Sequence, residues 1–215
     1  MISGSVVTLQ SALNDDYAFG DIDVYKLTTP TTCRIVGFSL KALPDTSSIT
    51  DGVSLKGGVD CVIEDVKATN ASYRCISVTS CFNVTIKNVT CMEDGSQDFG
   101  LDYGLGISNS SNITVEGGYF CAARHSVAIG GGTGPGRVTN RFISINNAYI
   151  TTNGDGNTQA ADMHANTEFV YYNNCFIDGG GIIGGDFTGY KGCTFTSPEA
   201  GLMVYGGSAK GGNFT

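Results

Sequence analysis

The fold is decided by the stretch Ile76-Ser-Val-Thr-Ser-Cys-Phe-Asn-Val-Thr-Ile-Lys-Asn-Val89. It consists of two short segments, 76–80 and 84–89, in which apolar and polar residues alternate, separated by a polar kink. Strict alternation is typical of a half-buried strand, with Val and Ile on one face and Ser, Thr and Lys on the other. Similar units recur along the chain, so the sequence predicts a repeat architecture.

The repeats share an internal ruler. In four repeats, a position in the first strand and one in the second strand lie eight residues apart: Leu55 and Ile63, Val78 and Ile86, Ile107 and Val115, and His164 and Tyr172. The second-strand markers Ile63, Ile86, Val115, Ile145, Tyr172 and Tyr190 follow one another at steps of 23, 29, 30, 27 and 18 residues. These steps are typical of parallel β-helix coils with variable loops. We therefore predict an all-β, single-stranded right-handed parallel β-helix of about eight coils.

Matched positions also predict the corners of the coils. Asn88, Gly117, Asn147, Asn174 and Gly192 recur there, and both residue types tolerate the left-handed backbone of a sharp corner. Cys175 and Cys193 each follow an inward marker by three residues, so they should stack in adjacent coils. The eight cysteines contain no CxxC pair, and we interpret them as buried free thiols. No metal and no cofactor is expected.

We expect one β-helix domain over residues 1–215, with irregular early coils in 1–50 and regular coils in 51–215. The chain shows no polar caps at its ends, so we expect either a piece of a longer protein or an oligomer that caps itself. The first residues lack the basic and apolar regions of a secretory signal peptide.

Composition excludes several partners. The net charge is −8 at pH 7, which argues against nucleic acid and anionic membranes because both are bound mainly through Lys and Arg. No run of about 18 apolar residues is present, so no membrane span is predicted.

Three long interruptions, 92–103, 130–140 and 151–159, mark the loops that could carry chemistry. The first and third leave the same corner of coils that flank Arg124 and His125. This arrangement places Asp98, Asp102, Tyr103, Arg124, His125 and Asp155 around one patch, with Asp162 and His164 at its far edge. The ruler directs Asp162 and His164 inward, whereas a slip of one residue would direct Ala161 and Met163 inward instead. Both readings remain open at this point.

The motifs in this region carry a family resemblance. Leu101-Asp-Tyr-Gly-Leu-Gly-Ile107, then Ser-Asn-Ser-Ser-Asn-Ile-Thr-Val115, then Arg124-His-Ser-Val-Ala-Ile-Gly130 resemble the G-D-D-C-I-x-I, S-x-N-I-T-V and G-H-G-I-S-I-G motifs of polygalacturonase-like glycoside hydrolases. These enzymes belong to the pectin-lyase-like β-helix superfamily, and the resemblance covers about residues 95–165. It implies that Asp102 is the general acid and that His125 matches the adjacent histidine. Tyr103 stands where the family has its second aspartate, and Asp162-Met163-His164 stands where it has a basic motif.

The acidic charge, degenerate coils and free thiols resemble the β-helix of bacteriophage tailspikes and capsule depolymerases, which are generally trimers that act on bacterial surface polysaccharide. We therefore predict a polysaccharide-cleaving glycoside hydrolase in a virion tail, acting as a homotrimer. The predicted catalytic residues are Asp102, His125, Asp162 and His164, and the predicted substrate-binding residues are Asp98, Tyr103, Arg124, Asp155 and Arg141. Asp102 and Asp162, two coils apart, would have backbones about 10 Å apart, near the upper end of the carboxylate separation of about 6.5–9.5 Å in inverting enzymes.

Two other functions stay open. A polysaccharide lyase of the same architecture would use a base such as Arg124, Arg137 or Arg141. A non-catalytic segment of a phage fibre would bind glycan or assemble without turnover. It is favoured because two aspartates of the family are missing: Tyr103 replaces one, and the upstream one has no counterpart near residues 77–80.

Overall fold

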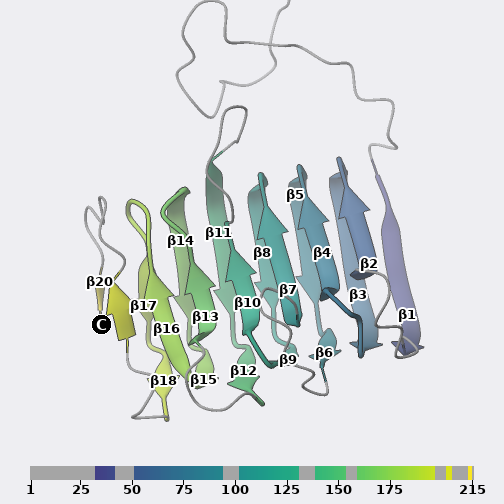
Figure 1. The fold of residues 1–215 in the computed structure, drawn as a ribbon. Helices are drawn as coiled ribbons and strands as arrows, with labels where there is room; N and C mark the ends of the chain where they lie inside the picture. Colours follow the sequence, from purple (N-terminus) through teal and green to yellow (C-terminus); the bar gives the residue numbers. More distant parts are fainter. Residues whose placement is uncertain are drawn as a thin grey trace, which may run out of the picture.

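The computed structural model describes residues 32–41, 51–93, 102–130, 139–153, 159–196, 202–204 and 213–214. All regular elements within these ranges are β-strands, and every ladder between them is parallel. Figure 1 shows the strands stacked side by side in successive coils. The predicted parallel β-helix is thus confirmed.

One row of strands forms a seven-stranded sheet, here called the first row. Its members in order are β2 (Asp51–Lys56), β4 (Arg74–Thr79), β7 (Tyr103–Ser108), β10 (His125–Ile129), β13 (Gln159–Met163), β16 (Gly180–Ile183) and β19 (Leu202–Val204). Each coil contributes one strand to this row, and the row has seven strands among the described residues. The expectation of about eight coils is therefore not supported.

The remaining strands form a 13-stranded sheet that covers two more sides of the helix, because β3 (Val59–Thr69) runs through both. The second row continues with β5 (Phe82–Lys87), β8 (Ser111–Glu116), β11 (Asn140–Asn146), β14 (Thr167–Asn173), β17 (Gly189–Lys191) and β20 (Asn213–Phe214). The third row continues with β6 (Thr90–Met92), β9 (Tyr119–Ala122), β12 (Tyr149–Thr152), β15 (Phe176–Asp178) and β18 (Thr194–Phe195). β1 (Arg34–Lys41) pairs with β3.

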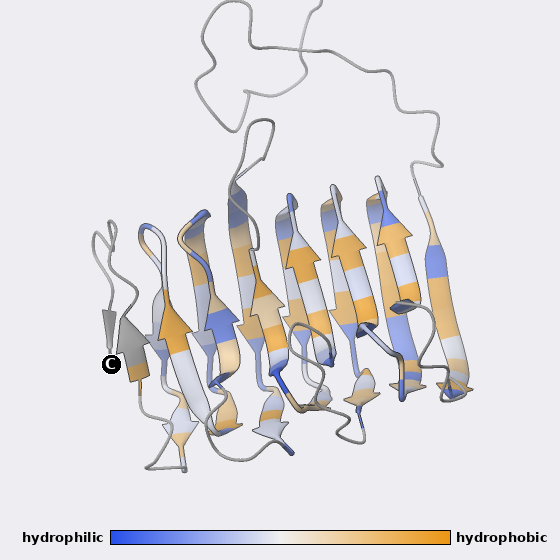
Figure 2. Cartoon of the chain, viewed as in Figure 1, coloured by the Kyte–Doolittle hydropathy of each residue, from blue (hydrophilic) through white to orange (hydrophobic). Residues whose placement is uncertain are grey.

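The core follows the sequence markers. Ile63, Ile86, Val115, Ile145, Tyr172 and Tyr190 occupy one register across the second row and are all buried. Figure 2 shows the alternating hydropathy along the strands. The five predicted corner residues all have positive φ, between 50° and 65°. Burial of these aligned apolar side chains, at roughly 25 cal/mol per Å² of apolar surface, is the main force that holds the coils together.

The ruler fails at one coil. Met163, not His164, pairs with Ile129 and lies in the core, so the connection from Met163 to Tyr172 contains one residue more than the corresponding connection from Val78 to Ile86. The slipped reading is therefore the right one, with Ala161 and Met163 inside. A single extra corner residue changes which side chains face water, because the side-chain period of a strand is two.

All eight cysteines are free thiols, and six of them are buried. Most of the segment expected to form irregular early coils, namely residues 1–31 and 42–50, lies outside the described residues. In the part of the chain that the structure describes, no helix is long and apolar enough to cross a membrane.

Candidate functional site

The candidate site lies on the outer side of the first row, where β7, β10 and β13 run next to each other. His125 opens β10 and Asp162 lies near the end of β13, paired with Ala128. Since Ala161 and Met163 point into the core, the alternation along β13 directs Asp162 to the outer side. His164 follows β13 directly.

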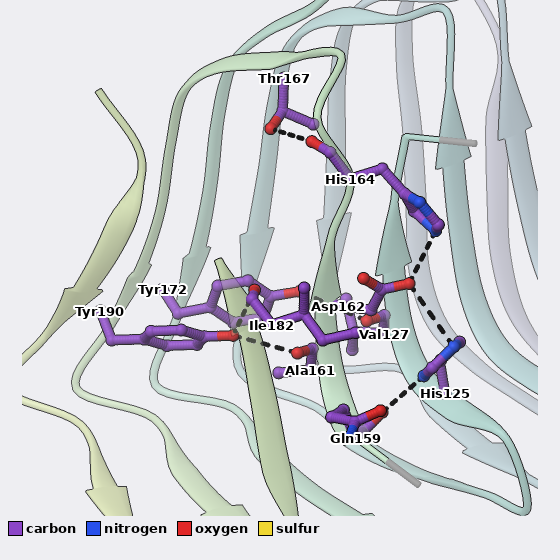
Figure 3. Close-up of polar contacts among 10 residues, drawn as sticks. All are labelled: His125, Val127, Gln159, Ala161, Asp162, His164, Thr167, Tyr172, Ile182 and Tyr190. Atoms are coloured by element: carbon purple, nitrogen blue, oxygen red, sulfur yellow. Dashed lines mark hydrogen bonds and ion pairs between the residues drawn. The ribbon is translucent and has the colours of Figure 1, made fainter. Parts of the chain in front are cut away.

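The two histidines of the chain converge on one carboxylate (Figure 3). His164 Nε2 lies 2.8 Å from Asp162 Oδ2, and His125 Nε2 lies 3.5 Å from the same oxygen. His125 Nδ1 is 2.6 Å from the carbonyl oxygen of Gln159, and Nδ1 must carry the hydrogen because a carbonyl only accepts. Asp162 itself is 1% exposed, whereas the His164 side chain is 50% exposed. His164 is therefore the member of the cluster that a substrate can reach.

The environment shifts the pKa values of the two imidazoles in opposite directions. Burial lowers the pKa of His125 below its ordinary value, and the attraction of Asp162 offsets only part of that effect. The hydrogen bond to Asp162 raises the pKa of His164. A pair of titratable groups with divergent pKa values in one cluster is a common feature of acid–base sites. The cluster therefore combines one imidazole that favours its neutral form with one that favours its protonated form.

Two inward tyrosines support the strands beneath the cluster. Tyr190 Oη lies 3.0 Å from the Ala161 carbonyl oxygen and 3.1 Å from that of Ile182, and Tyr172 Oη lies 3.4 Å from the Val127 carbonyl oxygen. The phenolic hydroxyls thus hydrogen-bond to β10, β13 and β16 from inside the helix (Figure 3). Both rings are buried and stack with centroids 5.0 Å apart. Their fixed positions restrain the backbone that carries Asp162.

Aromatic and cationic side chains extend the site toward β4. The Tyr103 ring lies 5.6 Å from His125 and 5.6 Å from the Tyr73 ring. The Arg124 guanidinium lies over Tyr103 at 5.4 Å, and the Arg74 guanidinium lies over Tyr73 at 4.2 Å. Such cation–π contacts keep the guanidinium groups in fixed positions on the surface.

Tyr73 and Arg74 were missed by the sequence analysis, although a signal was present. Arg74 pairs in register with Tyr103 on the next coil, so aligning the coils would have placed it beside the predicted site. The Arg74 side chain also lies over Gly106, where an added Cβ would come within 2.5 Å of Arg74 Cδ. The small residue at 106 makes room for the guanidinium along the outer side of the row.

Asp102 has a different environment from Asp162. It is buried, has φ +66°, and its charge helps to raise the pKa of Glu93. Burial is the first cause of that shift, followed by the proximity of Cys75, and it raises the pKa of Glu93 to about 10. Glu93 Oε1 accepts hydrogen bonds from Cys75 Sγ at 2.8 Å and from the Ala71 amide at 3.1 Å. Glu93 is therefore a neutral carboxylic acid at neutral pH, and it is another residue that the sequence analysis missed.

The structure brings together Tyr103, Arg124, His125, Asp162 and His164 from the predicted set. Arg141 is not part of this group, because it lies on the second row in an ion pair with Glu168 at 2.9 Å. Asp98, Asp155 and Arg137 lie outside the described residues. Within the described ranges no group of three or more His, Cys, Asp or Glu residues could hold a metal ion.

The three-sided parallel β-helix places the chain in the pectin-lyase-like class of proteins. The chain belongs to the Gp49 pectin lyase-like family, whose model matches residues 69–215. A search of curated proteins gave no match.

Solved structures of phage tailspikes are similar to this chain. The tailspike gp61 of Pseudomonas phage phi297 is 30% identical over 66% of this chain and 24% of its own, with a TM-score of 0.57. The tailspike gp49 of Pseudomonas phage LKA1 is 27% identical over 71% of this chain and 28% of its own, with a TM-score of 0.59. The tailspike Gp54 of Acinetobacter baumannii bacteriophage AP22, solved with an A. baumannii capsular saccharide, is 27% identical over 65% of this chain and 25% of its own, with a TM-score of 0.50. This chain thus covers about a quarter of the length of each.

Proposed function

We propose that this chain is a polysaccharide-cleaving part of a phage tailspike and that it cleaves by β-elimination at an acidic sugar. The observation that carries the proposal is the half-exposed His164 held by the buried Asp162. A carboxylate that fixes an imidazole and stabilises its charged form is the device that hydrolytic triads use to move a proton. The tailspike relatives, one of them solved with a capsular saccharide, support an extracellular glycan as the substrate.

In the proposed step, His164 removes the proton from the carbon next to the carboxylate of the sugar. The electron pair of that C–H bond forms a carbon–carbon double bond, and the bond from the neighbouring carbon to the glycosidic oxygen breaks. The imidazolium of His164, stabilised by Asp162, then gives its proton to the leaving oxygen. Arg124 supplies positive charge for the sugar carboxylate, since its guanidinium lies over Tyr103 next to His125. Arg74, one coil away, is already paired with Asp51 at 2.9 Å.

The hydrolase predicted from sequence is the second candidate, and a specific observation favours it. Asp102 and Glu93 are two buried carboxyl groups in electrostatic contact, and the pKa of Glu93 is raised to about 10. A carboxylic acid kept protonated at neutral pH beside a second carboxyl group is what glycoside hydrolysis requires. In that case Glu93 would serve as the acid and Asp102 as base or nucleophile, which reverses the general-acid role that the family resemblance implies for Asp102.

A panel of acidic and neutral bacterial capsule and O-antigen polysaccharides tests the proposal, with reducing ends and ultraviolet absorbance followed together. β-Elimination raises both signals, because the product contains a new double bond. Reducing ends without absorbance would overturn β-elimination and favour hydrolysis at Asp102. Binding without either signal would leave an adhesive module.

Two substitutions test which side chains take part in the reaction and in substrate binding. His164→Asn should lower the rate by about two orders of magnitude or more, as expected for loss of a general acid or base, and Arg124→Gln should raise KM for the acidic glycan. Arg34→Gln is the matched control, because Arg34 is an exposed arginine of β1 that pairs with Glu64. A His164→Asn variant with unchanged kcat would refute the assignment.

We also propose that the tailspike is a homotrimer and that a stack of two exposed phenylalanines, Phe142 and Phe187, with the half-buried Phe169 between them contributes to its interface. Phe142, Phe169 and Phe187 stack on the second row with centroids 5.2 and 5.1 Å apart, and all three have positive φ between 53° and 54°. Exposed apolar side chains in a strained backbone conformation favour a surface that becomes covered. Light scattering tests this: trimers are expected, and Phe169→Asp should shift the protein toward monomer. A monomeric wild-type chain would overturn the proposal for this part of the tailspike.

A further inference from the structure

Two cysteines meet at the corner between the second and third rows in neighbouring coils. The Thr194 amide donates to the Cys175 carbonyl at 2.9 Å, which places Cys193 directly beside Cys175 on the next coil. The Cys175 amide in turn donates to Cys193 Sγ at 3.4 Å. Neighbouring strands lie about 4.8 Å apart, within the Cα separation of about 4.4–6.8 Å that disulfides span.

The two thiols differ in exposure and in charge. Cys175 is 2% exposed, whereas Cys193 is partly exposed. The hydrogen bond from Cys175 lowers the pKa of Cys193 to about 7, and the same contact raises the pKa of Cys175. Both sulfurs also face backbone carbonyl oxygens, since Cys175 Sγ lies 3.4 Å from those of Ile145 and Asn173 and Cys193 Sγ lies 3.3 Å from that of Tyr172. One member of the pair is therefore a reachable nucleophile, and the other is a buried partner in contact with it.

A second pair in the same chain provides a contrast. Cys75 and Cys91 are also in contact, and this contact contributes to the raised pKa of Cys75. Both are 0% exposed, and the Cys75 thiol donates to Glu93 and to the Ala68 carbonyl. Both sulfurs of this pair are therefore out of reach of an oxidant.

We propose that Cys193 and Cys175 form a redox-modification site that closes a disulfide between two successive coils when a low-molecular-weight disulfide is present. The Cys193 thiolate attacks one sulfur of oxidised glutathione, forms a mixed disulfide and releases one glutathione thiolate. That thiolate takes the Cys175 proton, and the Cys175 sulfur attacks Cys193, which releases the second glutathione. Two protein thiols are oxidised, and one oxidised glutathione is reduced to two thiols.

The disulfide would act where the described solenoid has its shortest pairings. β15 and β18 pair through only Phe176–Thr194 and Ile177–Phe195, so few backbone hydrogen bonds hold this edge of the third row. A covalent link between residues 175 and 193 would hold the two coils together when these hydrogen bonds open.

Peptide mapping of the whole chain tests the site. The reduced protein is equilibrated with reduced and oxidised glutathione at several ratios, quenched with acid, alkylated and digested. We expect a cross-linked 175–193 peptide that has lost two hydrogens, while Cys75 and Cys91 remain free and are alkylated only after denaturation. The oxidised protein should also melt at a higher temperature than the reduced protein.

Single variants separate the two steps. Cys175→Ser should accumulate the mixed disulfide on Cys193, and Cys193→Ser should leave Cys175 unmodified. The wild-type map alone decides the question if either variant fails to fold. The proposal is overturned if Cys193 stays reduced in excess oxidised glutathione, if wild type stops at the mixed disulfide, or if Cys75 and Cys91 oxidise as fast.

Discussion

Replacing Asp162 by Asn tests the electrostatic account of the candidate site directly. The substitution keeps the size of the side chain and removes its charge. A hydrogen bond to a charged group contributes about 1.5–3 kcal/mol, but the His164 side chain is 50% exposed, so solvent screening reduces the effect. About 1 kcal/mol of the interaction remains after that screening. We expect the pKa of His164 to fall back toward its ordinary value in this variant.

The assay is an NMR titration of the imidazole carbons, which is simple because the chain has only two histidines. The pKa of His125 should fall less than that of His164, since its Nε2 lies 3.5 Å from Asp162 Oδ2 rather than 2.8 Å. Asp178→Asn is the control, because Asp178 lies on the third row and bonds Thr196. An unchanged His164 titration in Asp162→Asn, or a larger change at His125, would refute the proposed pairing.

Three further predictions concern stability and are measured by chemical denaturation. Glu93→Gln should raise the free energy of unfolding at pH 8 by about 1–3 kcal/mol, because Gln replaces a buried acid that must stay protonated; equal stability of both proteins at pH 8 would contradict this. Gly104→Ala should cost about 1–3 kcal/mol, since the new Cβ would lie 2.4 Å from the Ser126 carbonyl oxygen, whereas Gly117→Asn should stay within about 0.5 kcal/mol because no atom lies within 4 Å of that position. Tyr190→Phe should cost about 1 kcal/mol through its lost hydrogen bonds, and a neutral effect would show that the hydroxyl does not support β13.

The sequence predicted the fold well because the information is local and repeated. The markers in the second row, such as Ile86 and Val115, fall in one register, since alternation and corner residues act within each coil. The failure at His164 has an equally local cause, a corner with one extra residue. No alternation pattern contains that information, because polar residues are acceptable on the outer face and, when paired, inside the helix as well.

The site was harder to predict because it depends on neighbours in other coils. Arg74 and Tyr103 are 29 residues apart and meet only through the register of β4 and β7. Glu93 reads as a solvated loop residue, and its burial becomes visible only when Cys75 and Ala71 pack against it. Arg141 is a different case: it was predicted to bind substrate, and its strand lies in the second row, away from the histidine cluster.

The titrating groups His164, Glu93 and His125 do not all make stability depend on pH in the same direction. His164 and Glu93 have higher pKa values in the folded protein than in the unfolded chain. Their protonation therefore contributes stability that is fully present below the pKa values of the unfolded chain. This stability is lost as pH rises through the pKa values of the folded protein. The lowered pKa of His125 acts in the opposite sense, because stability is lost as pH falls from its ordinary value through the folded one. Proton removal by His164 needs its neutral form, so the rate should rise with pH through the raised pKa of that group. As pH rises above neutrality, the reaction rate should therefore increase while the free energy of unfolding decreases. The Glu93→Gln variant should stay folded and active to higher pH, because it removes the larger loss of stability, that from Glu93, and leaves His164 unchanged.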